Sequence, residues 1–424
     1  MTKKSDAPAI RFKGFSDAWE QRKFGDVFDC TVPNNTLSRV ELSYDEGTVL
    51  NVHYGDVLIK YGSVLDVQKD DIPRIPHRCI EDFNGALLQD GDVIIADTAE
   101  DETTGKACEI GNLQGSAIVS GLHTMVCRPR NRMALGYLGY YLNSNAYHHQ
   151  LLPLMQGIKV LSLSRSNIQK TTVSYPSAMK EQQLIASYFS QLDHLITLHQ
   201  RKFEKLTNVK KSMLEKMFPQ NGSSYPEIRF KGFTDPWEQR KAIDIADYSK
   251  GNGYSKGDLT DAGTPIILYG RLYTKYQFAI SEVDTFAVPR NGAVYSQGNE
   301  VIVPASGETA EDIARASAVE ESGVLLGGDL NILRPFDFIN PLFLALAISN
   351  GEPQKELAKK AQGKSVVHIH NTDIQEVTIA YPSRTEQDRI VSVFRQLDHL
   401  ITLHQRELEK LQNIKKSMLE KMFV

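Results

Sequence analysis

Two long stretches of the chain carry apolar residues at a spacing of seven. In residues 181–218 and 386–423 this spacing continues from end to end, and neither Gly nor Pro interrupts it. A seven-residue apolar repeat of that length is typical of a coiled-coil seam. The pattern therefore predicts two long helices packed as a coiled coil. The predicted seam residues are Ile185, Leu192, His199 and Leu206 in the first helix, and Ile390, Leu397, His404 and Leu411 in the second.

The rest of the chain carries shorter patterns. Residues 92–96 and 300–304 are apolar runs typical of buried strands, and residues 173–175 and 377–381 alternate between apolar and polar positions. Segments 136–142 and 342–348 have helical patterns, and turn residues are frequent between all of these elements. The expected fold class is α+β, with two mixed α/β domains and two long helices.

An internal repeat organises these elements. Residues 10–23 read IRFKGFSDAWEQRK and residues 228–241 read IRFKGFTDPWEQRK, while 29 of 38 positions are identical between 181–218 and 386–423. The intervening parts diverge, although Gln156-Gly157 returns as Gln362-Gly363. The chain is therefore expected to be a tandem repeat with a pseudo-two-fold axis.

The repeat sets the expected domain boundaries, which are a first domain at 1–180, a central helix at 181–218, a linker with a second domain at 219–385, and a C-terminal helix at 386–424. Two identical domains on a two-fold frame would read a palindrome in DNA. Two domains that share a frame but differ in their variable parts would read two different half-sites.

The repeated motifs resemble those of a known family. R-F-x-G-F-x-x-x-W-E stands before each variable part, and a Tyr-Pro pair followed by Glu-Gln (Tyr175 to Gln182, Tyr381 to Gln387) leads into each long helix. This arrangement, which covers nearly the whole chain, resembles the specificity subunits of type I restriction–modification enzymes. The resemblance implies two target-recognition domains separated by two antiparallel helices, each domain reading one part of a bipartite DNA site.

The same resemblance implies the partners. Two methyltransferase subunits, which methylate adenine N6 with S-adenosylmethionine, would dock on the chain, and two ATP-driven motor–nuclease subunits that need Mg²⁺ would join them. The chain itself would be non-catalytic and hold no cofactor. A helix of about 37 residues is about 55 Å long, ample to hold two domains one DNA turn, about 34 Å, apart. Antiparallel packing would bring His199 and His404 towards each other, where a polar pair could fix the register of the helices. The alternative is that each histidine is partly exposed and merely tolerated.

Composition changes this picture little. The chain has 424 residues, 41% hydrophobic and 24% charged, as expected of an ordinary globular protein. A net charge of −4 argues mildly against nucleic-acid binding, but net charge says little about local patches. The four cysteines form no C-x-x-C pair, which fits a reducing cytoplasm. The sequence has no apolar run long enough to predict a membrane span or a secretory leader.

Candidate catalytic motifs fail on inspection. Gly363–Ser365 ends like a phosphate loop, but the required earlier glycine is Ala358. Asn340–Phe343 resembles the Asn-Pro-Pro-Phe motif of amino-methyltransferases without its second proline, and a Pro at a helix start explains it. His368 and His370 are a weak metal pair at best. We expect no metal site and no reaction catalysed by this chain alone.

Double-stranded DNA is read by Arg, Lys, Asn, Gln, Ser, Thr and Tyr on loops, although any such residue can also be merely solvated. In the first half the DNA-binding candidates are Lys60, Tyr61, Ser63, Lys159, Ser162, Ser164 and Arg165. In the second half they are Tyr254, Ser255, Lys256, Tyr269, Arg271, Tyr273, Lys275, Lys364, His368 and His370. The competing hypotheses are an interaction scaffold, which would not bind duplex DNA, and a single-chain enzyme, which would turn over a substrate alone.

Overall fold

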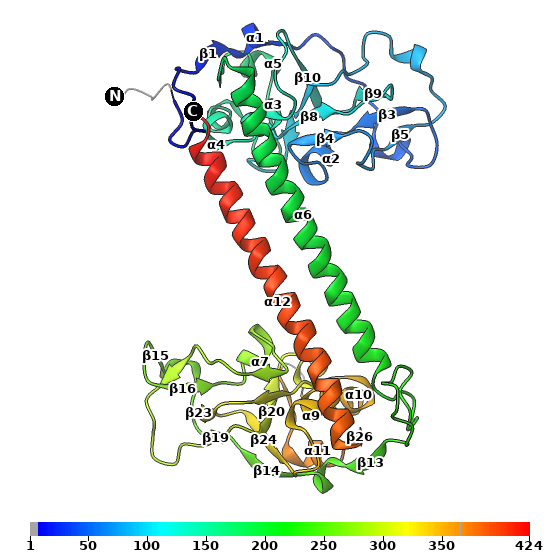
Figure 1. The fold of residues 1–424 in the computed structure, drawn as a ribbon, viewed down its shortest axis with the longest axis vertical. Helices are drawn as coiled ribbons and strands as arrows, with labels where there is room; N and C mark the ends of the chain where they lie inside the picture. Colours follow the sequence, from blue (N-terminus) through cyan, green and yellow to red (C-terminus); the bar gives the residue numbers. More distant parts are fainter. Residues whose placement is uncertain (1–6, 364–365) are drawn as a thin grey trace. The chain divides into compact units, whose positions relative to one another are not determined.

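The computed structural model describes residues 7–363 and 366–424. The chain forms two compact units, Met1–Gln200 with Arg406–Val424, and Arg201–Gln405. Two helices of 38 residues each, α6 (Met179–Lys216) and α12 (Arg384–Lys421), contribute one portion to each unit (Figure 1). The long helices predicted from the seven-residue repeat are therefore confirmed.

The first unit is built on a five-stranded sheet. Its strand order is β2 (Phe28–Asp29), β10 (Thr124–Pro129), β6 (Val93–Ala96), β8 (Ala107–Gly111) and β4 (Val64–Asp66), antiparallel except for β4 beside β8. Three smaller sheets are β5 (Arg74–Ile75), β3 (Val49–Val52) and β9 (Ala117–Ser120); β1 (Glu20–Lys23) with β12 (Thr172–Tyr175); and β7 (Thr98–Ala99) with β11 (Leu161–Ser162).

The second unit repeats the five-stranded main sheet of the first. Its main sheet has the order β14 (Ala246–Lys250), β24 (Leu330–Pro335), β20 (Glu300–Pro304), β22 (Ser317–Val319) and β17 (Ala279–Ile280). Another sheet contains β15 (Leu259–Thr260), β18 (Phe286–Ala287), β16 (Thr264–Ile267), β23 (Ser322–Leu326) and β19 (Tyr295–Gln297). The pairs are β13 (Glu238–Lys241) with β26 (Thr378–Tyr381), and β21 (Ser306–Gly307) with β25 (Val367–His368). The predicted strands at 92–96, 300–304, 173–175 and 377–381 are confirmed.

Short helices complete both units. The α-helices are α1 (Phe24–Val27), α2 (Tyr54–Ile59), α3 (Tyr137–Leu142), α4 (Asn145–His148), α5 (Arg165–Ile168), α7 (Arg271–Thr274), α8 (Ala310–Ile313), α9 (Pro341–Ile348), α10 (Gly351–Lys360) and α11 (Asn371–Gln375). The 3₁₀ turns are η1 (Arg39–Glu41), η2 (Ile80–Phe83), η3 (Leu152–Leu154), η4 (Ala242–Asp244) and η5 (Lys256–Asp258). The predicted helices at 136–142 and 342–348 correspond to α3 and α9.

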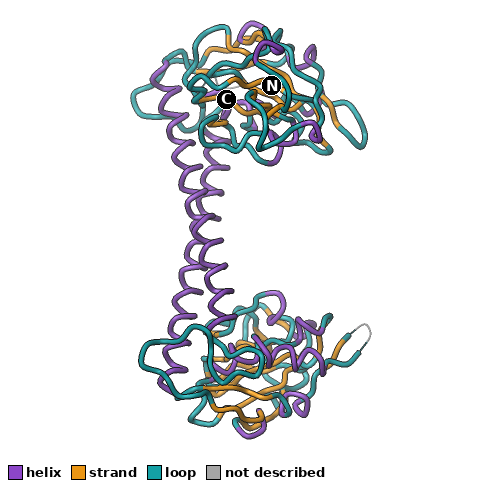
Figure 2. The backbone as a smooth tube through the Cα atoms, turned by 90° about the vertical axis from the view of Figure 1, so that its right-hand side faces the viewer, coloured by secondary structure: helices purple, strands orange, loops and turns teal. Residues whose placement is uncertain are grey.

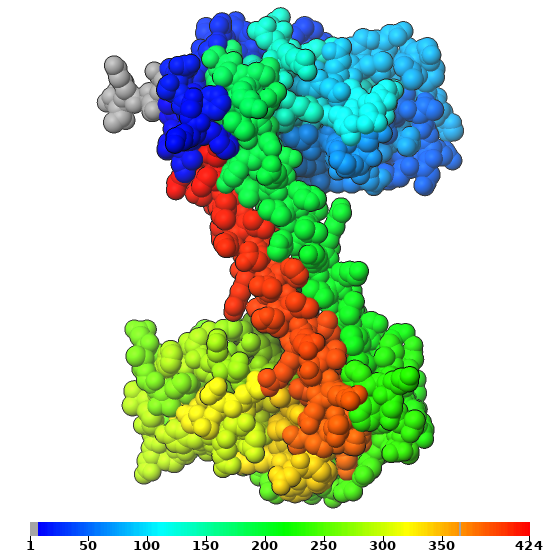
Figure 3. All heavy atoms as spheres, in the orientation of Figure 1, coloured from blue at the N-terminus to red at the C-terminus, as the bar shows by residue number. Residues whose placement is uncertain are grey.

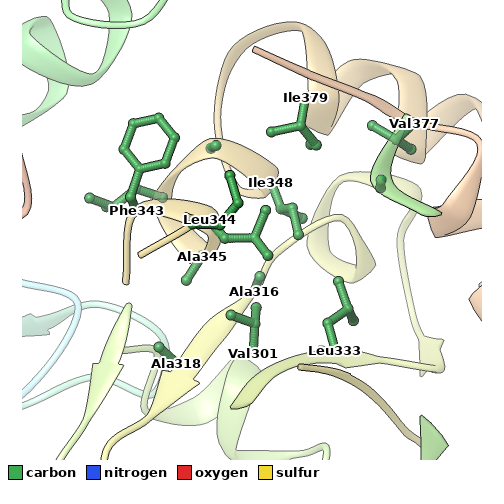
Figure 4. Close-up of a cluster of buried hydrophobic side chains, with 14 of the residues drawn as sticks. Val301, Ala316, Ala318, Leu333, Phe343, Leu344, Ala345, Ile348, Val377 and Ile379 are labelled. Atoms are coloured by element: carbon green, nitrogen blue, oxygen red, sulfur yellow. The ribbon is translucent and has the colours of Figure 1, made fainter. Parts of the chain in front are cut away.

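The largest core cluster of each unit lies between the main sheet and these helices. In the second unit, Figure 4 shows the sheet residues Val301, Ala318 and Leu333 facing Phe343, Leu344, Ala345 and Ile348 of α9. Helix α9 begins where it does because Asn340 Oδ1 accepts hydrogen bonds from Leu342 N and Phe343 N, at 2.9 and 3.3 Å, with Pro341 in the first turn. The Asn340–Phe343 motif is thus an ordinary helix cap.

The repeated motifs make the same contacts in both units. Arg11 forms a two-pronged ion pair with Glu181 at 2.6 and 2.8 Å, and Arg229 forms one with Glu386 at 2.8 and 2.8 Å. Both glutamates stand at the start of a long helix and are almost fully buried. The repeated Arg and Glu-Gln motifs therefore fasten each domain to its helix.

In each unit, the C-terminal end of the other long helix packs against the repeated motif, and these parts together form the frame of the unit. In the first unit, Ile10 N donates to Lys421 O at 2.9 Å and Trp19 packs edge-on against Phe423 at 6.3 Å. Figure 3 shows the C-terminal residues in red against the N-terminal segment in blue. In the second unit, Ile228 N donates to Lys216 O at 2.9 Å and Trp237 packs against Phe218.

The long helices run antiparallel in each unit, side by side (Figure 2). In the first unit, Asp193 pairs with Lys415 at 2.5 Å and Phe189 stacks on Phe423 at 5.6 Å. In the second unit, Lys210 pairs with Asp398, also at 2.5 Å, and Phe218 contacts Phe394. Each contact in one unit is the image of the contact in the other, displaced by 205 positions of the sequence repeat.

Candidate nucleic-acid interface

A short hairpin stands out from the surface of the first unit. Gln156 and Ser162 exchange backbone hydrogen bonds at 3.0 and 2.8 Å and enclose the tip, residues 157–161. Gly157 has a φ of +126°, and a Cβ on it would lie 1.9 Å from the backbone oxygen of Val160. Only glycine therefore fits at this turn.

The hairpin is anchored at its base. Ser162 pairs with Thr98, Leu163 N donates to Asp97 O at 2.8 Å, and the Leu163 side chain is buried in the core. Its tip is open: Ile158 is 99% exposed and Val160 51% exposed.

The second unit has equivalent contacts around residues 362–368. Gln362 and His368 exchange backbone hydrogen bonds at 3.2 and 2.8 Å, and Gly363 has a φ of +143° with Val366 O at 1.9 Å from its would-be Cβ. Ile369 N donates to Ala305 O at 3.1 Å, as Leu163 does in the first unit. The Gln-Gly pairs seen in the sequence thus stand at equivalent positions, where each hairpin begins.

Polar side chains gather beside the first hairpin. Thr98 Oγ1 donates to Asp97 Oδ1 at 2.8 Å and lies 3.4 Å from His123 Nδ1, while His123 lies 3.5 Å from Asp97 Oδ1. The Tyr54 ring packs edge-on against His123 at 5.3 Å. These donors and acceptors are of the kinds that read base edges.

A corresponding cluster lies beside the second hairpin. Ser306 Oγ lies 3.1 Å from His368 Nδ1, and Tyr273 Oη donates to the Ser306 backbone oxygen at 2.6 Å. The Tyr269 ring packs edge-on against Tyr273 at 6.2 Å. Three of the sequence-predicted residues, Tyr269, Tyr273 and His368, are therefore brought together here.

Exposed carboxylates lie near these clusters. Glu100, Asp101 and Glu102 follow β7 and are exposed, and Glu308 follows β21. Carboxylates repel phosphate. The hairpin tip of the first unit carries Lys159 and no carboxylate, so the tip suits DNA better than the loops after these strands.

The remaining first-half candidates have other surroundings. Lys60 Nζ donates to Asp71 Oδ2 at 2.8 Å and lies over the Tyr44 ring. Tyr61 is 3% exposed, and burial raises the pKa of its hydroxyl. Ser63 is half-buried beside Asn143. Tyr61 is a core residue in this structure, and these three residues are not joined to the hairpin cluster by any recorded contact among the described residues.

Near the first hairpin, Lys159 is exposed at the tip and Ser164 caps α5 through a bond from Asn167 N at 3.2 Å. Arg165 is exposed in the first turn of α5. In the second unit, His370 is exposed at the start of α11. The candidate Lys364 lies outside the described residues.

Several second-half candidates are held by neighbours. Tyr254 is buried and its hydroxyl accepts from Arg290 N at 2.7 Å. Ser255 Oγ donates to Asp258 at 2.9 Å, whereas Lys256 is exposed. Lys275 and Arg271 both bind Asp284, at 2.6 and 2.5 Å.

A single carboxylate therefore engages two positive charges. The ammonium of Lys275 and the guanidinium of Arg271 hold the pKa of Asp284 well below its usual range. A carboxylate that already satisfies both cations leaves them less able to bind phosphate. Lys256 is exposed, and it is more available to phosphate than Arg271 and Lys275.

Sequence reasoning did not select Tyr54, Thr98, His123 and Ser306. Thr98 and Ser306 each follow a buried strand, β6 or β20, after one intervening residue. Polar residues just past buried strands could have singled out these two positions. His123 has a φ of +53°, and its counterpart by backbone bonding, Asp329, has a φ of +56°, which no sequence pattern indicates.

Residues 7–363 and 366–424 lack two features. They contain no group of three or more His, Cys, Asp or Glu side chains placed to hold a metal ion. None of their helices combines the length and apolar character that a membrane span needs.

The helix seam was also assigned by sequence. Ile185, Leu192 and Ile390 are buried, and the seam positions Leu206, Leu397 and Leu411 are half-buried with His199 and His404. His199 belongs to the first unit and His404 to the second, so their approach stays a prediction.

Other leucines of the helices face outwards. Leu195 and Leu198 are 40% and 38% exposed, and their repeat images Leu400 and Leu403 are 40% and 44% exposed. Residues three apart lie on one face of a helix. Each unit thus presents an exposed leucine pair within an identical sequence, QLDHLITLHQ.

The chain is similar to known proteins. Residues 16–208 and 234–413 match the family model described as a type I restriction modification DNA specificity domain. Two relatives from Methanocaldococcus jannaschii are each 21% identical. The type I restriction enzyme MjaVIII specificity subunit matches over 57% of this chain and 59% of its own length. The putative type I restriction enzyme MjaX specificity subunit matches over 95% and 92%.

A solved structure has the same fold. The crystal structure of a type-I restriction-modification system S subunit from M. genitalium aligns with a TM-score of 0.62 at 13% identity, covering 99% of both chains.

Proposed function

Because the chain belongs to the family of type I restriction–modification specificity subunits, we propose that each of its two units reads one half of a bipartite, asymmetric DNA site. The paired helices set the spacing between the half-sites and dock two methyltransferase subunits. S-adenosylmethionine, ATP and Mg²⁺ are used by those subunits and by two motor–nuclease subunits, not by this chain.

One observation carries this proposal. The frame residues Arg11, Trp19 and Glu181 make the same contacts as Arg229, Trp237 and Glu386, yet the loops between them diverge. Equal frames hold the two domains in equivalent poses towards DNA. Different loops on equal frames give each domain its own half-site, which excludes a palindrome as the target.

A loop exchange tests the reading of two half-sites. The variable part of the second unit, residues 242–377, is replaced by residues 24–171 of the first, with both frames retained, and the complex with methyltransferase subunits is expressed. We expect methylation to move to a palindromic split site that keeps the first half-site. Sequencing of modified adenines checks this. Methylation that keeps the second half-site contradicts the proposal.

The exposed leucine pairs support a proposal for partner docking. Two copies of one partner need two alike surfaces, and Leu195 with Leu198 and Leu400 with Leu403 supply apolar surface in identical sequence. Exposed apolar residues grouped on one face mark interaction sites. We therefore assign one methyltransferase subunit to each pair.

Charge substitution on each pair tests the docking. Leu198→Glu is expected to release one methyltransferase subunit, Leu403→Glu the other, and the double variant both. The reason is that burying a carboxylate in an apolar contact costs binding free energy. Mass photometry measures the stoichiometry. Thr197→Glu, on an exposed neighbouring position, is the control. Retention of both subunits by the double variant contradicts this assignment.

A further inference from the structure

We propose that the hairpin tip of the first unit, Ile158 to Val160, is a base-reading element that places Ile158 against a thymine methyl group in the major groove of the first half-site. The inference rests on the proposed function and adds a specificity-determining residue to it. Ile158 is 99% exposed and Val160 51% exposed. The free energy falls when a partner surface covers an apolar side chain that was exposed to water.

The tip is held ready for binding. Gly157 closes a turn that no Cβ would fit, the Gln156–Ser162 bonds close the base, and Leu163 anchors the strand in the core. The exposed side chains therefore stand on a fixed backbone, so binding orders little of the chain. A fixed apolar tip is suited to docking into a groove of matching shape.

Comparison of the two hairpins identifies DNA as the occupant. The closing ends of the two hairpins are equivalent. Gln156 and Gly157 in the first unit correspond to Gln362 and Gly363 in the second. The tips differ, since the first reads Ile-Lys-Val and the second Lys-Ser-Val. A surface for two copies of one protein partner would be alike in both units, as the exposed leucine pairs are. Equal supports with unequal tips are what two different half-sites require.

The chemistry of the tip suits a thymine. A two-stranded β-ribbon fits the major groove, where thymine presents its C5-methyl group as an apolar feature. An isoleucine can contact that methyl group, and Lys159 beside it can bind a phosphate or a guanine edge. Ser162 at the foot of the hairpin pairs with Thr98, which contacts His123, so polar side chains lie next to the tip.

The experiment first maps the target by sequencing modified adenines in cells that express the chain with its methyltransferase subunits. The purified complex is then titrated with duplexes in which single thymines of the first half-site are replaced by uracil, which lacks only the methyl group. We expect one replacement to weaken binding about fourfold, the value of one buried methyl group. Ile158→Ala should weaken binding to the natural site by roughly tenfold and should be insensitive to that uracil.

Matched controls separate the possible outcomes. Val366→Ala, on the second hairpin, should leave uracil sensitivity in the first half-site unchanged. Because Ile158 is exposed, its substitution leaves the fold intact, and unchanged methyltransferase stoichiometry verifies this. The inference is overturned if Ile158→Ala and the natural chain bind all duplexes equally, if the first half-site has no thymine, or if the variant loses a methyltransferase subunit. A complex that methylates no bipartite site would instead refute the proposed function.

Discussion

Glu109 is a buried carboxyl whose protonation is coupled to folding. It is 1% exposed and accepts a hydrogen bond from Gly139 N, at 2.9 Å, at the start of α3. Burial raises the pKa of Glu109 to about 7 from an ordinary value of 4.5, against the opposing effect of the backbone N–H groups. The unfolded chain releases this proton at lower pH than the folded chain, so stability falls as pH rises from 4.5 towards 7.

Replacing this carboxyl should remove that pH dependence. Glu109→Gln keeps an acceptor for Gly139 N and carries no charge. We expect it to be more stable than the natural chain above pH 7 by about 1–3 kcal/mol, and to lose this advantage near pH 4.5. Thermal unfolding from pH 5 to pH 8 measures the difference. Glu102→Gln, an exposed control, should show no such trend, and parallel curves for Glu109→Gln would contradict the prediction.

The buried ion pairs of the frame give a second prediction at this scale. The side chains of Arg11 and Glu181 are 13% and 1% exposed. Glu181→Leu leaves the guanidinium without its partner and should cost about 3–5 kcal/mol, whereas Arg11→Met with Glu181→Leu should cost much less. Hydrogen exchange of β1 and β12 reports this loss. Glu386→Leu should affect only the second unit, and equal costs for the single and double variants would refute the mechanism.

Single residues were predictable where the repeat marked them. Arg11 and Glu181 recur at Arg229 and Glu386, and both pairs prove to be structural. Residue type alone was a poor guide to the interface. Tyr61 looked like a loop residue but is buried, because whether a tyrosine faces inwards depends on contacts with distant segments.

At the scale of elements, the long helices were predictable because their apolar period is local and uninterrupted. The hairpins were not, since each rests on a two-residue strand whose partner lies about sixty residues away. The Gln-Gly repeat was the visible trace of them. The order of strands in the sheets could not be predicted from the sequence either, because β4 and β8 pair across a sequence separation that no periodicity reveals.

Helix ends are critical elements in this fold. Phe423, 4% exposed at the end of α12, packs against the rings of Trp19, Tyr137, Tyr141 and Phe189 at 5.6–6.3 Å between centroids. Phe423→Ala should destabilise the first unit by about 3–5 kcal/mol through the cavity it leaves. Hydrogen exchange should show faster opening of α3 and β12.

The matched change lies at the end of the other helix. Phe218→Ala should have the same effect on the second unit, with faster opening of α9 and β26, because Phe218 contacts Trp237 and Phe343 as Phe423 contacts its neighbours. If either variant loosens both units equally, the helix ends do not act locally and the prediction is wrong.

At the scale of the whole molecule, each unit is completed by a segment from the other half of the sequence. Residues 406–424, which include the last part of α12, complete the first unit, while the equivalent residues 201–219 lie in the second. In the first unit Lys415 binds Asp193 and Phe423 stacks on Phe189. The repeat offers Lys210 in place of Lys415, and Phe218 in place of Phe423, so one half of the chain contains everything its own unit needs.

A chain of residues 1–220 should therefore form a two-fold dimer in which each copy's residues 201–219 complete the partner copy's first unit. Five positions differ between residues 201–219 and 406–424: Phe203, Thr207 and Pro219 replace Leu408, Gln412 and Val424, and two further changes bear on stability. Val209 replaces Ile414, at about 0.5–1.5 kcal/mol, and Lys202 replaces Glu407, where an exposed pair contributes only about 0.2–1 kcal/mol. With methyltransferase subunits, the dimer should methylate a palindromic split site made of the first half-site and its inverted repeat, with about the same spacer. Sequencing of modified adenines and the mass of the complex check this, and a fragment of residues 1–195, which lacks the completing segment, should stay monomeric. Methylation that remains on the asymmetric site, or a 1–220 chain that binds DNA only as a monomer, would show that the two halves are not interchangeable.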